Sequence, residues 1–334
     1  MLLIITLSIF VISQIILSHY AKVLNLIDKP DDRKKHEGNI PTVGGVSLFL
    51  SLFIFYLLAD ISQNYKLILL TSLIVFLSGL LDDIFKLSVL TRVLLQLAAC
   101  LILILNGFRV LYLGEYEILG NLSLGVISIP FSIIAIMLLT NSINWIDGLD
   151  GLASIIYLQS YFAINAFLFF YGNNIEYISI YSVLFLNLLI FIFINMNKLP
   201  ITKSFLGDSG SILIGYLLSC HMIHINISPE INIHPILIAW AVGFPIFNII
   251  TVMLLRALKL NNPFSPDRLH LHHVLQDRGI NDGSIVLILF SFAAFLSLIG
   301  GFIFYFFGSF VSLLSFIFIF ILYISLNFIY AYRN

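Results

Sequence analysis

Long apolar segments, separated by shorter polar gaps, alternate along the whole of this chain. A helix of about 20 apolar residues is long enough to cross a hydrocarbon core of about 30 Å. The segments have roughly that length, and almost no ionisable side chains interrupt them. We expect about eleven membrane-spanning helices, near residues 1–20, 43–60, 66–82, 89–106, 123–140, 152–171, 178–195, 208–225, 234–256, 285–307 and 309–331. The predicted fold class is an all-α integral membrane protein, a polytopic helical bundle.

The composition excludes a soluble domain. The residues are 60% hydrophobic and 10% charged, with a mean hydropathy of +1.07, whereas a soluble domain is about 45–50% apolar. The first segment lacks a basic stretch before it and a small-residue cleavage site, so we interpret it as a retained span with the N-terminus outside. Cys100 and Cys220 lie within apolar segments, which argues against a disulfide framework or a thiol-based metal site. With no internal repeat or linker, residues 1–334 are expected to form a single integral membrane domain.

The charged side chains are distributed unequally between the gaps. Every Lys and Arg except Lys66 and Arg109 lies in the gaps that follow odd-numbered segments, or at the C-terminal end. By the positive-inside rule these gaps face the cytoplasm. Most of the 17 Asp and Glu residues share this side, although the rule makes little demand on acidic residues. The sequence therefore predicts a cytoplasmic active-site cleft.

Two adjacent carboxylates, Asp82 and Asp83, end the third segment and are followed by Lys86. Carboxylates at the C-terminal end of a helix face the negative end of its dipole, so a cation is expected beside them. In one interpretation, Asp82 pairs with Lys86 four residues later and both are solvated. In the other, the carboxylates contact a divalent cation or a nucleophile and Lys86 contacts a phosphate group.

Asn141, Asn144, Asp147 and Asp150 lie within residues 141–151, between the fifth and sixth segments. Asp and Gly suit helix caps and turns, which by itself accounts for some of this pattern. Four amide or carboxylate groups so close together exceed what a turn requires. Asn144 and Asp147 are therefore candidate oxygen ligands or hydrogen-bond partners.

Asp208 lies at the start of the eighth segment, within Gly207 to Ser211, where an N-cap residue is expected. A helix N-terminus flanked by small residues is also suited to bind an anion, and a carboxylate there would let a metal bridge protein and phosphate. Asn195 and Lys203 precede it on the same side of the membrane.

The longest cytoplasmic gap carries Arg268, His270, His272 and His273. Ser265 and Pro266 predict the start of a short interfacial helix, and Gly279 its end, with His270 and His273 on one face. Zinc is disfavoured because no Cys and no HExxH pattern accompanies the imidazoles. Recognition of a diphosphate and a sugar suits Arg268 and these His residues better. His36, in the basic first loop, is either part of an orientation signal that contacts anionic lipid or a ligand contact.

Taken in order, these pieces resemble the polyprenyl-phosphate N-acetylhexosamine-1-phosphate transferases over nearly the whole chain. The matching pieces are the loop at 29–45, Asp82 with Asp83, residues 141–151, residues 205–211 and residues 265–273. The resemblance implies a helical bundle with Mg²⁺ or Mn²⁺ as cofactor, in the cytoplasmic (inner) membrane of a bacterium and commonly dimeric. It implies two partners, a UDP-N-acetylhexosamine and undecaprenyl phosphate, in contact with membrane lipid and without nucleic acid.

Within this family, the His-x-His-His loop resembles the branch that transfers N-acetylglucosamine 1-phosphate from its UDP-sugar and releases UMP. Such an enzyme starts a lipid-linked surface glycan such as O-antigen or teichoic acid. Lys86 instead resembles the peptidoglycan branch, which uses UDP-N-acetylmuramoyl-pentapeptide, and that function is the alternative. An ion-coupled transporter is the alternative from another class, but its ionisable groups would lie near the membrane midplane.

The resemblance also implies residue roles. Asp208, with Asn144 or Asp147, would hold the metal on the diphosphate, while Asp82 and Asp83 position or deprotonate the lipid phosphate. Direct attack by that phosphate and a covalent aspartyl-phosphate on Asp83 are both open. The residues expected to bind substrate are His36, Lys86, Asn144, Asp147, Asn195, Arg268, His270, His272 and His273.

Overall fold

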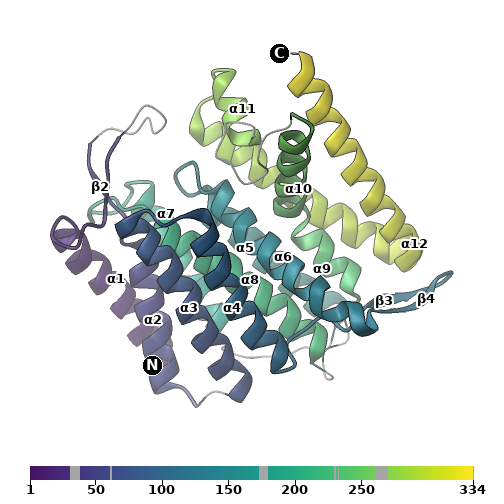
Figure 1. Cartoon of the computed structure of the whole chain (residues 1–334), viewed down its shortest axis with the longest axis horizontal. Coiled ribbons are helices and arrows are strands. Elements are labelled where there is room, and N and C mark those ends of the chain that lie inside the picture. The colour runs from purple at the N-terminus through teal and green to yellow at the C-terminus, as the bar shows by residue number, and fades with distance from the viewer. Residues whose placement is uncertain are drawn as a thin grey trace. The chain divides into compact units, whose positions relative to one another are not determined.

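The computed structural model describes residues 1–30, 38–60, 62–172, 180–228, 231, 233–259 and 270–333, and helices dominate it (Figure 1). Two compact units are distinguished by their internal contacts. The first comprises Met1–Asn106 with Tyr177–Leu218, and the second Gly107–Glu176 with Ser219–Asn334. Each is described here by itself.

Helices of the first unit are α1 (Leu2–Tyr20), α2 (Gly44–Leu58), α3 (Gln63–Phe85), α4 (Val89–Leu105), α7 (Ile180–Asn195) and the first part of α8 (Gly207–Ile227). Helix α2 packs against α1, α3 and α7, and α3 against α4. Between α1 and α2, the short strands β1 (Ile27–Asp28) and β2 (Ile40–Pro41) pair in antiparallel fashion. An apolar cluster of Ala21, Leu26 and Val43 packs against Leu80 and Ile84, so these strands are anchored beside the end of α3.

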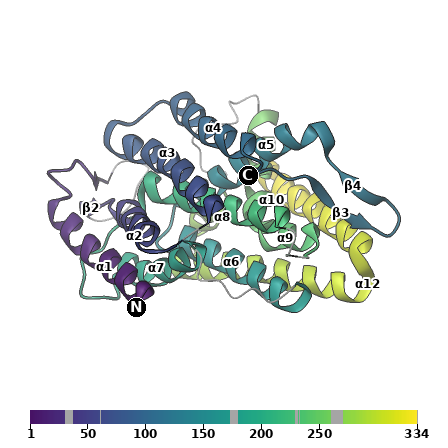
Figure 2. The same cartoon turned by 90° about the horizontal axis from the view of Figure 1, so that it is seen from below.

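Elements of the second unit are β3 (Tyr112–Tyr116), β4 (Gly120–Ser123), the 3₁₀ turn η1 (Gly125–Ile127), α5 (Ser128–Ile146), α6 (Leu152–Tyr171), α9 (Pro235–Ala241), α10 (Gly243–Leu258), α11 (Leu271–Asp277) and α12 (Asp282–Arg333), with the end of α8. Strands β3 and β4 form an antiparallel hairpin. Figures 1 and 2 both show this hairpin beside α12, in agreement with the contacts of β3 with α9 and α12. Helix α12 also packs against α6, α9 and α10.

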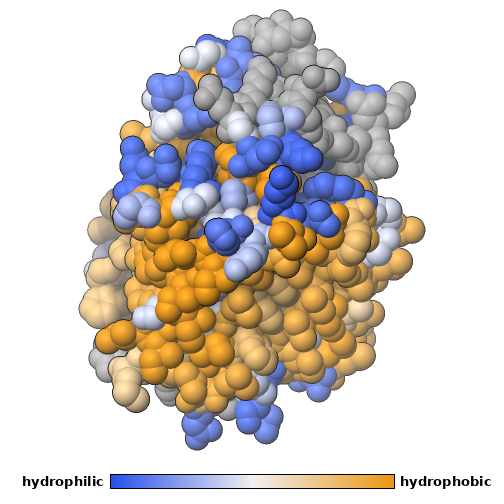
Figure 3. Space-filling view, turned by 90° about the vertical axis from the view of Figure 1, so that its left-hand side faces the viewer, coloured by the Kyte–Doolittle hydropathy of each residue, from blue (hydrophilic) through white to orange (hydrophobic). Residues whose placement is uncertain are grey.

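The surface of the helices is apolar, as expected for side chains that face lipid. In Figure 3, hydrophobic side chains cover most of the face on the side of α1 and α2, and hydrophilic ones gather toward one end. On α1, Ile4 is 69% exposed and Ile12 54% exposed. Burial of such side chains in lipid would remove a large apolar surface from water, which makes the membrane the favourable environment.

Each segment predicted from the hydropathy pattern coincides with helix in the described residues. Within the part of the chain that the structure describes, six helices are long and apolar enough to span a membrane, or seven if the bent pair α9 and α10 forms one span. These two helices meet at 71°. Pro245 near the start of α10 has no N–H to donate to the preceding turn, which favours the break there. Helix α12 is interrupted at Gly308, whose φ is +81°, and so contains both of the last two predicted segments.

Candidate active site

The ends of three helices bring acidic and basic side chains together in the first unit. Asp82 lies in the last turn of α3, Arg92 in the first turns of α4 and Asp208 in the first turn of α8. Nη1 of Arg92 lies 2.9 Å from Oδ2 of Asp82 and 3.7 Å from Oδ2 of Asp208. Arg92 therefore faces two carboxylates, one from α3 and one from α8. We call Asp82, Arg92 and Asp208 the aspartate–arginine cluster.

Asp83 points to a different partner from its neighbour. Its Oδ1 accepts a hydrogen bond from the backbone N–H of Asp208 at 2.9 Å, and its Oδ2 accepts one from Ser209 at 3.0 Å. Because α8 begins at Gly207, Asp208 lies inside the helix and does not occupy the N-cap position that the sequence predicted. The first free N–H groups of a helix need an acceptor. The Asp83 side chain, from another helix, supplies it.

Glycines allow these backbones to approach closely. A Cβ on Gly79 would lie 2.5 Å from the carbonyl oxygen of Asp208, and one on Gly45 would collide with the backbone of Gly210. The backbone N–H groups of Gly44 and Gly45 donate to the carbonyls of Phe205 and Leu206. The start of α8 is therefore held between α2 and α3 by contacts that leave no room for a side chain.

Lys86 and Asn195, two predicted substrate contacts, both lie in the first unit. Lys86 ends α3 in the left-handed conformation with φ 55°, and Asp82 forms its ion pair with Arg92. Asn195 is 4% exposed, and its side-chain amide donates to the carbonyl of Ser204 at 2.9 Å. Asn195 thus holds the segment that leads into α8.

A second cluster lies in the second unit, around Arg256 in the last turn of α10. This side chain is 2% exposed, although it carries a charge. Its guanidinium lies over the ring of Trp145, 4.6 Å from the centroid, and its Nη2 is 3.3 Å from Nε2 of His270. Stacking on an aromatic ring partly compensates a desolvated cation.

The predicted residues Asn144 and Asp147 lie beside this cluster in sequence, where α5 ends. Asn144 is in its last turn and Asp147 is the exposed C-cap residue, whose N–H donates to the carbonyl of Asn144 at 3.2 Å. The next residue, Gly148, is in close contact with the ring of His272, which a Cβ there would strike. His272 is 2% exposed.

His270 and His273 do not share a face of a helix, as the sequence predicted they would. Helix α11 begins at Leu271, so His270 is its N-cap residue and lies outside the helix. The rings of His270 and His272 stack at 5.7 Å, and His273 contacts His272 at 4.2 Å. Helix α11 ends at Asp277, two residues before Gly279, whose φ is +80°. The predicted end of the helix is thereby confirmed. The predicted residues His36 and Arg268 lie outside the described residues, as does the predicted helix start.

The aspartate–arginine cluster suits a divalent metal that substrate helps to bind. In the described parts of the chain, no three His, Cys, Asp or Glu side chains converge as a metal site. Mg²⁺ is commonly bound by only one or two carboxylates together with substrate phosphates and water. Asp82 and Asp208 provide two such oxygen donors, both within 4 Å of one cationic nitrogen. Asn144 and Asp147 remain predicted ligands.

Arg92 and Arg256 were missed because the sequence offered another explanation for them, namely orientation by the positive-inside rule. One signal could have found them: each is the sole charged residue of its helix, α4 or α10. A lone charge in an apolar helix is costly unless it has a partner, so it indicates a functional position.

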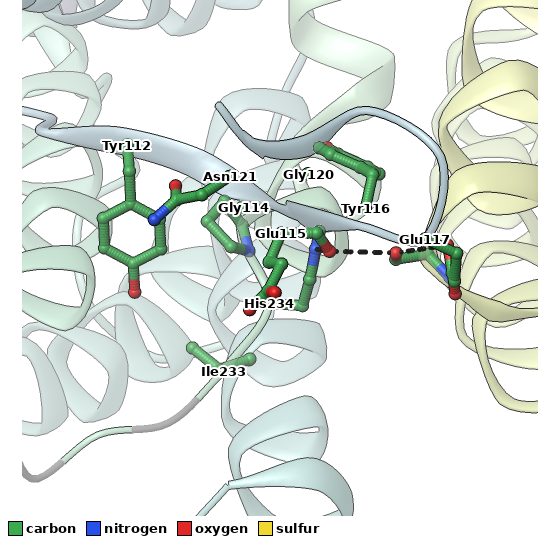
Figure 4. A pocket seen from close by; sticks show the side chains of 11 residues that line it. Tyr112, Gly114, Glu115, Tyr116, Glu117, Gly120, Asn121, Ile233 and His234 are labelled. Carbon is green, nitrogen blue, oxygen red and sulfur yellow. Dashed lines mark hydrogen bonds between the residues drawn. The ribbon is translucent and has the colours of Figure 1, made fainter. Parts of the chain in front are cut away.

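A separate cavity of about 660 Å³ lies in the second unit, beside the β3–β4 hairpin and the N-terminal end of α9 (Figure 4). The carboxylate of Glu117 accepts hydrogen bonds from the N–H groups of Ser309 and Phe310, each at 2.8 Å. His234 Nε2 lies 2.9 Å from the carbonyl of Glu115. The described residues that line this cavity include none of the predicted site residues.

Comparison with known proteins decides the family. The model described as Glycosyl transferase family 4 matches residues 65–226. The undecaprenyl-phosphate alpha-N-acetylglucosaminyl 1-phosphate transferase of Escherichia coli (strain K12) is 31% identical over 285 residues, which are 84% of this chain and 77% of the relative. The chain belongs to glycosyl transferase family 4. The family predicted from the motifs, that of the polyprenyl-phosphate N-acetylhexosamine-1-phosphate transferases, is thereby confirmed.

Two further relatives of this glycosyl transferase carry similar names. The undecaprenyl-phosphate alpha-N-acetylglucosaminyl 1-phosphate transferase of Yersinia pestis is 29% identical over 280 residues, 83% of this chain and 76% of the relative. A probable undecaprenyl-phosphate N-acetylglucosaminyl 1-phosphate transferase of Bacillus subtilis (strain 168) is 28% identical over 281 residues, 82% of this chain and 76% of the relative. These names favour neither the peptidoglycan alternative nor a transporter.

Proposed function

We propose that this glycosyl transferase moves N-acetylhexosamine 1-phosphate, foremost N-acetylglucosamine 1-phosphate, from a UDP-sugar to undecaprenyl phosphate. An oxygen of the lipid phosphate forms a bond to the sugar-bearing phosphorus. The bond from that phosphorus to the bridging oxygen breaks, and UMP leaves. The names of the relatives support this reaction, and so does the aspartate–arginine cluster, the observation that carries the proposal.

In this proposal, Arg92 binds phosphate when the substrates are present. Its side chain is 23% exposed, whereas that of Asp82 is 9% exposed, so the guanidinium borders solvent and the carboxylate lies beneath it. A guanidinium matches phosphate oxygens in a fixed fork geometry. Arg92 can therefore exchange part of its contact with Asp208, at 3.7 Å, for a contact with diphosphate.

Asp82 and Asp208 are the proposed ligands of Mg²⁺, for which Mn²⁺ could substitute. When bound, the metal would offset the negative charge of the diphosphate and of the departing UMP. The lipid phosphate needs no strong base, because the second pKa of a phosphate monoester is about 6 and the group is mostly dianionic near pH 7. Asp82, as a metal ligand, and Arg92, as a phosphate contact, are then required mainly to hold the charged groups of the substrates in position.

His270, His272 and Arg256 are proposed to bind the nucleotide or its phosphates in the second unit. Arg256 holds His270 in place through the contact at 3.3 Å, and Trp145 covers the guanidinium. His273 is held by Gln276 at 3.1 Å and borders the same loop. Asn144, Asp147, Lys86 and Asn195, with His36 and Arg268, remain proposed substrate-binding residues from the sequence.

The setting of the reaction is also proposed from the sequence. The basic gaps would face the cytoplasm of a bacterium, where a soluble UDP-sugar meets a membrane-bound phosphate. The product would start a surface glycan such as O-antigen or teichoic acid, and the enzyme would act as a homodimer in the inner membrane.

The decisive experiment is reconstitution of the purified protein with undecaprenyl phosphate, Mg²⁺ and one UDP-sugar at a time. We expect a lipid product with the mass of N-acetylglucosaminyl diphosphate undecaprenol, together with an equal amount of UMP. Asp208→Asn should abolish both products. Transfer from UDP-N-acetylmuramoyl-pentapeptide alone, or uptake into proteoliposomes without release of UMP, would overturn the proposal.

A further inference from the structure

Asp82 and Asp83 are neighbours in sequence, yet their carboxylates face different groups. Asp82 faces Arg92 at 2.9 Å and, across it, Asp208. Asp83 faces the backbone at the start of α8, 125 and 126 residues further along the chain. The side chains of consecutive helix residues point about 100° apart, so two neighbouring residues at one helix end can contact different groups.

Both oxygens of Asp83 are engaged by the turn that carries Asp208. They lie 2.9 Å and 3.0 Å from the N–H groups of Asp208 and Ser209, a fork that matches two successive donors. A Cβ on Gly207, whose φ is +73°, would lie 2.7 Å from Oδ2 of Asp83. The carboxylate therefore sits directly against the turn, in a space that only glycine leaves open.

The backbone of α3 also contacts the first turn of α8. Gly79, one turn before Asp83 on α3, lies against Asp208 and Ser209, where a Cβ would come within 2.6 Å of Cα of Ser209. The first residues of α8 are thus fixed to α3 at two successive turns. The direction of the Asp208 side chain follows from that attachment.

We propose that Asp83 is a positioning residue, which aims the Asp208 carboxylate by holding the first turn of α8, and which neither attacks phosphorus nor removes a proton. This inference rests on the function proposed above. For Asp83 to act as a nucleophile, an oxygen would have to leave an N–H group of α8 and move away from the turn that it holds. The same bonds also occupy two N–H groups of α8, which are then not offered to a substrate phosphate.

Asp83→Asn tests the proposal, because the amide keeps the size of the carboxylate but has one acceptor oxygen and one N–H donor group. One of the two α8 N–H groups then faces a donor. We expect faster hydrogen exchange at the start of α8, and an affinity for Mn²⁺, followed by electron paramagnetic resonance, that is roughly 10- to 100-fold weaker. Raising the Mn²⁺ concentration should restore much of the transfer rate.

Asp282→Asn is the matched control. Asp282 lies in the first turn of α12, where its carboxylate accepts a hydrogen bond from Gln276 at 2.9 Å. That variant should leave both the α8 exchange and the Mn²⁺ spectrum unchanged. If Asp83→Asn abolishes transfer while exchange in α8 and Mn²⁺ affinity stay at the wild-type level, Asp83 acts chemically and the proposal is wrong.

A measurement on the unmodified enzyme covers the case in which the variant does not fold. UDP-N-acetylglucosamine labelled at the sugar-bearing phosphate is incubated with the enzyme without lipid acceptor. We expect neither labelled protein nor a burst of UMP, whereas an aspartyl-phosphate mechanism would give both. If the enzyme transfers nothing even with lipid present, the proposed function fails, while the exchange and Mn²⁺ measurements still decide the role of Asp83.

Discussion

Gly79→Ala is the sharpest test of how closely the site depends on helix contact. In a free helix the change would be favourable, since Ala is preferred over Gly by about 0.5–1 kcal/mol. Here the new Cβ would lie 2.5 Å from the carbonyl oxygen of Asp208, whereas ordinary contacts begin at 3.4 Å. The difference, 3.4 minus 2.5, requires α3 and α8 to separate by about 0.9 Å.

Such a displacement has two expected consequences. Overpacking costs about 1–3 kcal/mol, which exceeds the gain in helix propensity, so the variant should unfold at a lower temperature. Activity should fall further, because a misplacement of about 1 Å in a catalytic constellation can reduce the rate about 100-fold. We therefore expect kcat for sugar phosphate transfer to fall by about two orders of magnitude in protein that is still folded.

The assay follows release of UMP at saturating UDP-sugar and lipid phosphate. Thermal unfolding of each variant gives the fraction of protein that is folded. Gly283→Ala is the matched control, because Gly283 is also helical and, among the described residues, a Cβ there meets only Asn281, at 3.6 Å. That variant should retain wild-type activity. If Gly79→Ala turns over at the wild-type rate, α3 does not control the position of Asp208 and the reasoning is refuted.

Three further predictions address other parts of the molecule. Arg92→Lys keeps the charge but loses the guanidinium whose Nη1 contacts two carboxylates. We expect kcat/KM to fall roughly 10-fold or more, as loss of a charged hydrogen bond of about 1.5–3 kcal/mol implies; an unchanged value in steady-state kinetics would remove Arg92 from the site. Gly148→Ala should push the His272 ring out of place and raise KM for the UDP-sugar, with little effect on KM for the lipid; equal effects on both would contradict a nucleotide role. The backbone N–H of Glu117 and its bonds from Ser309 and Phe310 lower the pKa of the Glu117 carboxyl from 4.5 to about 2. Because the folded pKa is depressed, this stabilisation is complete above about pH 4.5 and is lost as the pH falls toward 2. Unfolding temperatures of wild type and Glu117→Gln should therefore differ at pH 7 and converge near pH 2, and a constant difference would argue against the carboxylate cap.

The hydropathy pattern predicted the helices well because a helix in lipid must satisfy its own backbone hydrogen bonds. The positions where such helices can occur are therefore visible as apolar segments. The pattern could not reveal that residues 234–256 form two helices at 71°. The angle between two such helices depends on the backbone angles at the break and on how neighbouring helices pack around it. The pattern did separate the last two segments at residue 308, where Gly308 has non-helical backbone angles.

The candidate site was predicted in part. Asp82 and Asp83 were predicted as site residues because carboxylates at the C-terminal end of a helix are unexpected without a cation. Asp208 was predicted because a helix N-terminus flanked by small residues suits an anion. Arg92 was not predicted as a site residue, because the positive-inside rule already accounted for its charge. The spacing of the imidazoles predicted His270 and His273 on one helix face, but His270 lies outside α11, and the ring of His272 stacks on that of His270.

By itself, the sequence determined that this is a membrane protein and to which family it belongs. The length of the apolar segments and the order of the polar motifs are properties of the chain alone. The sequence also predicted which ends of the helices carry the chemistry. Only the tertiary structure decided that Asp82 faces Arg92 while its neighbour Asp83 binds the first turn of α8. The reason is that a side chain's partner depends on the rotation and spacing of packed helices. Those are set by contacts such as Gly79 against Asp208, which lie far apart in the sequence.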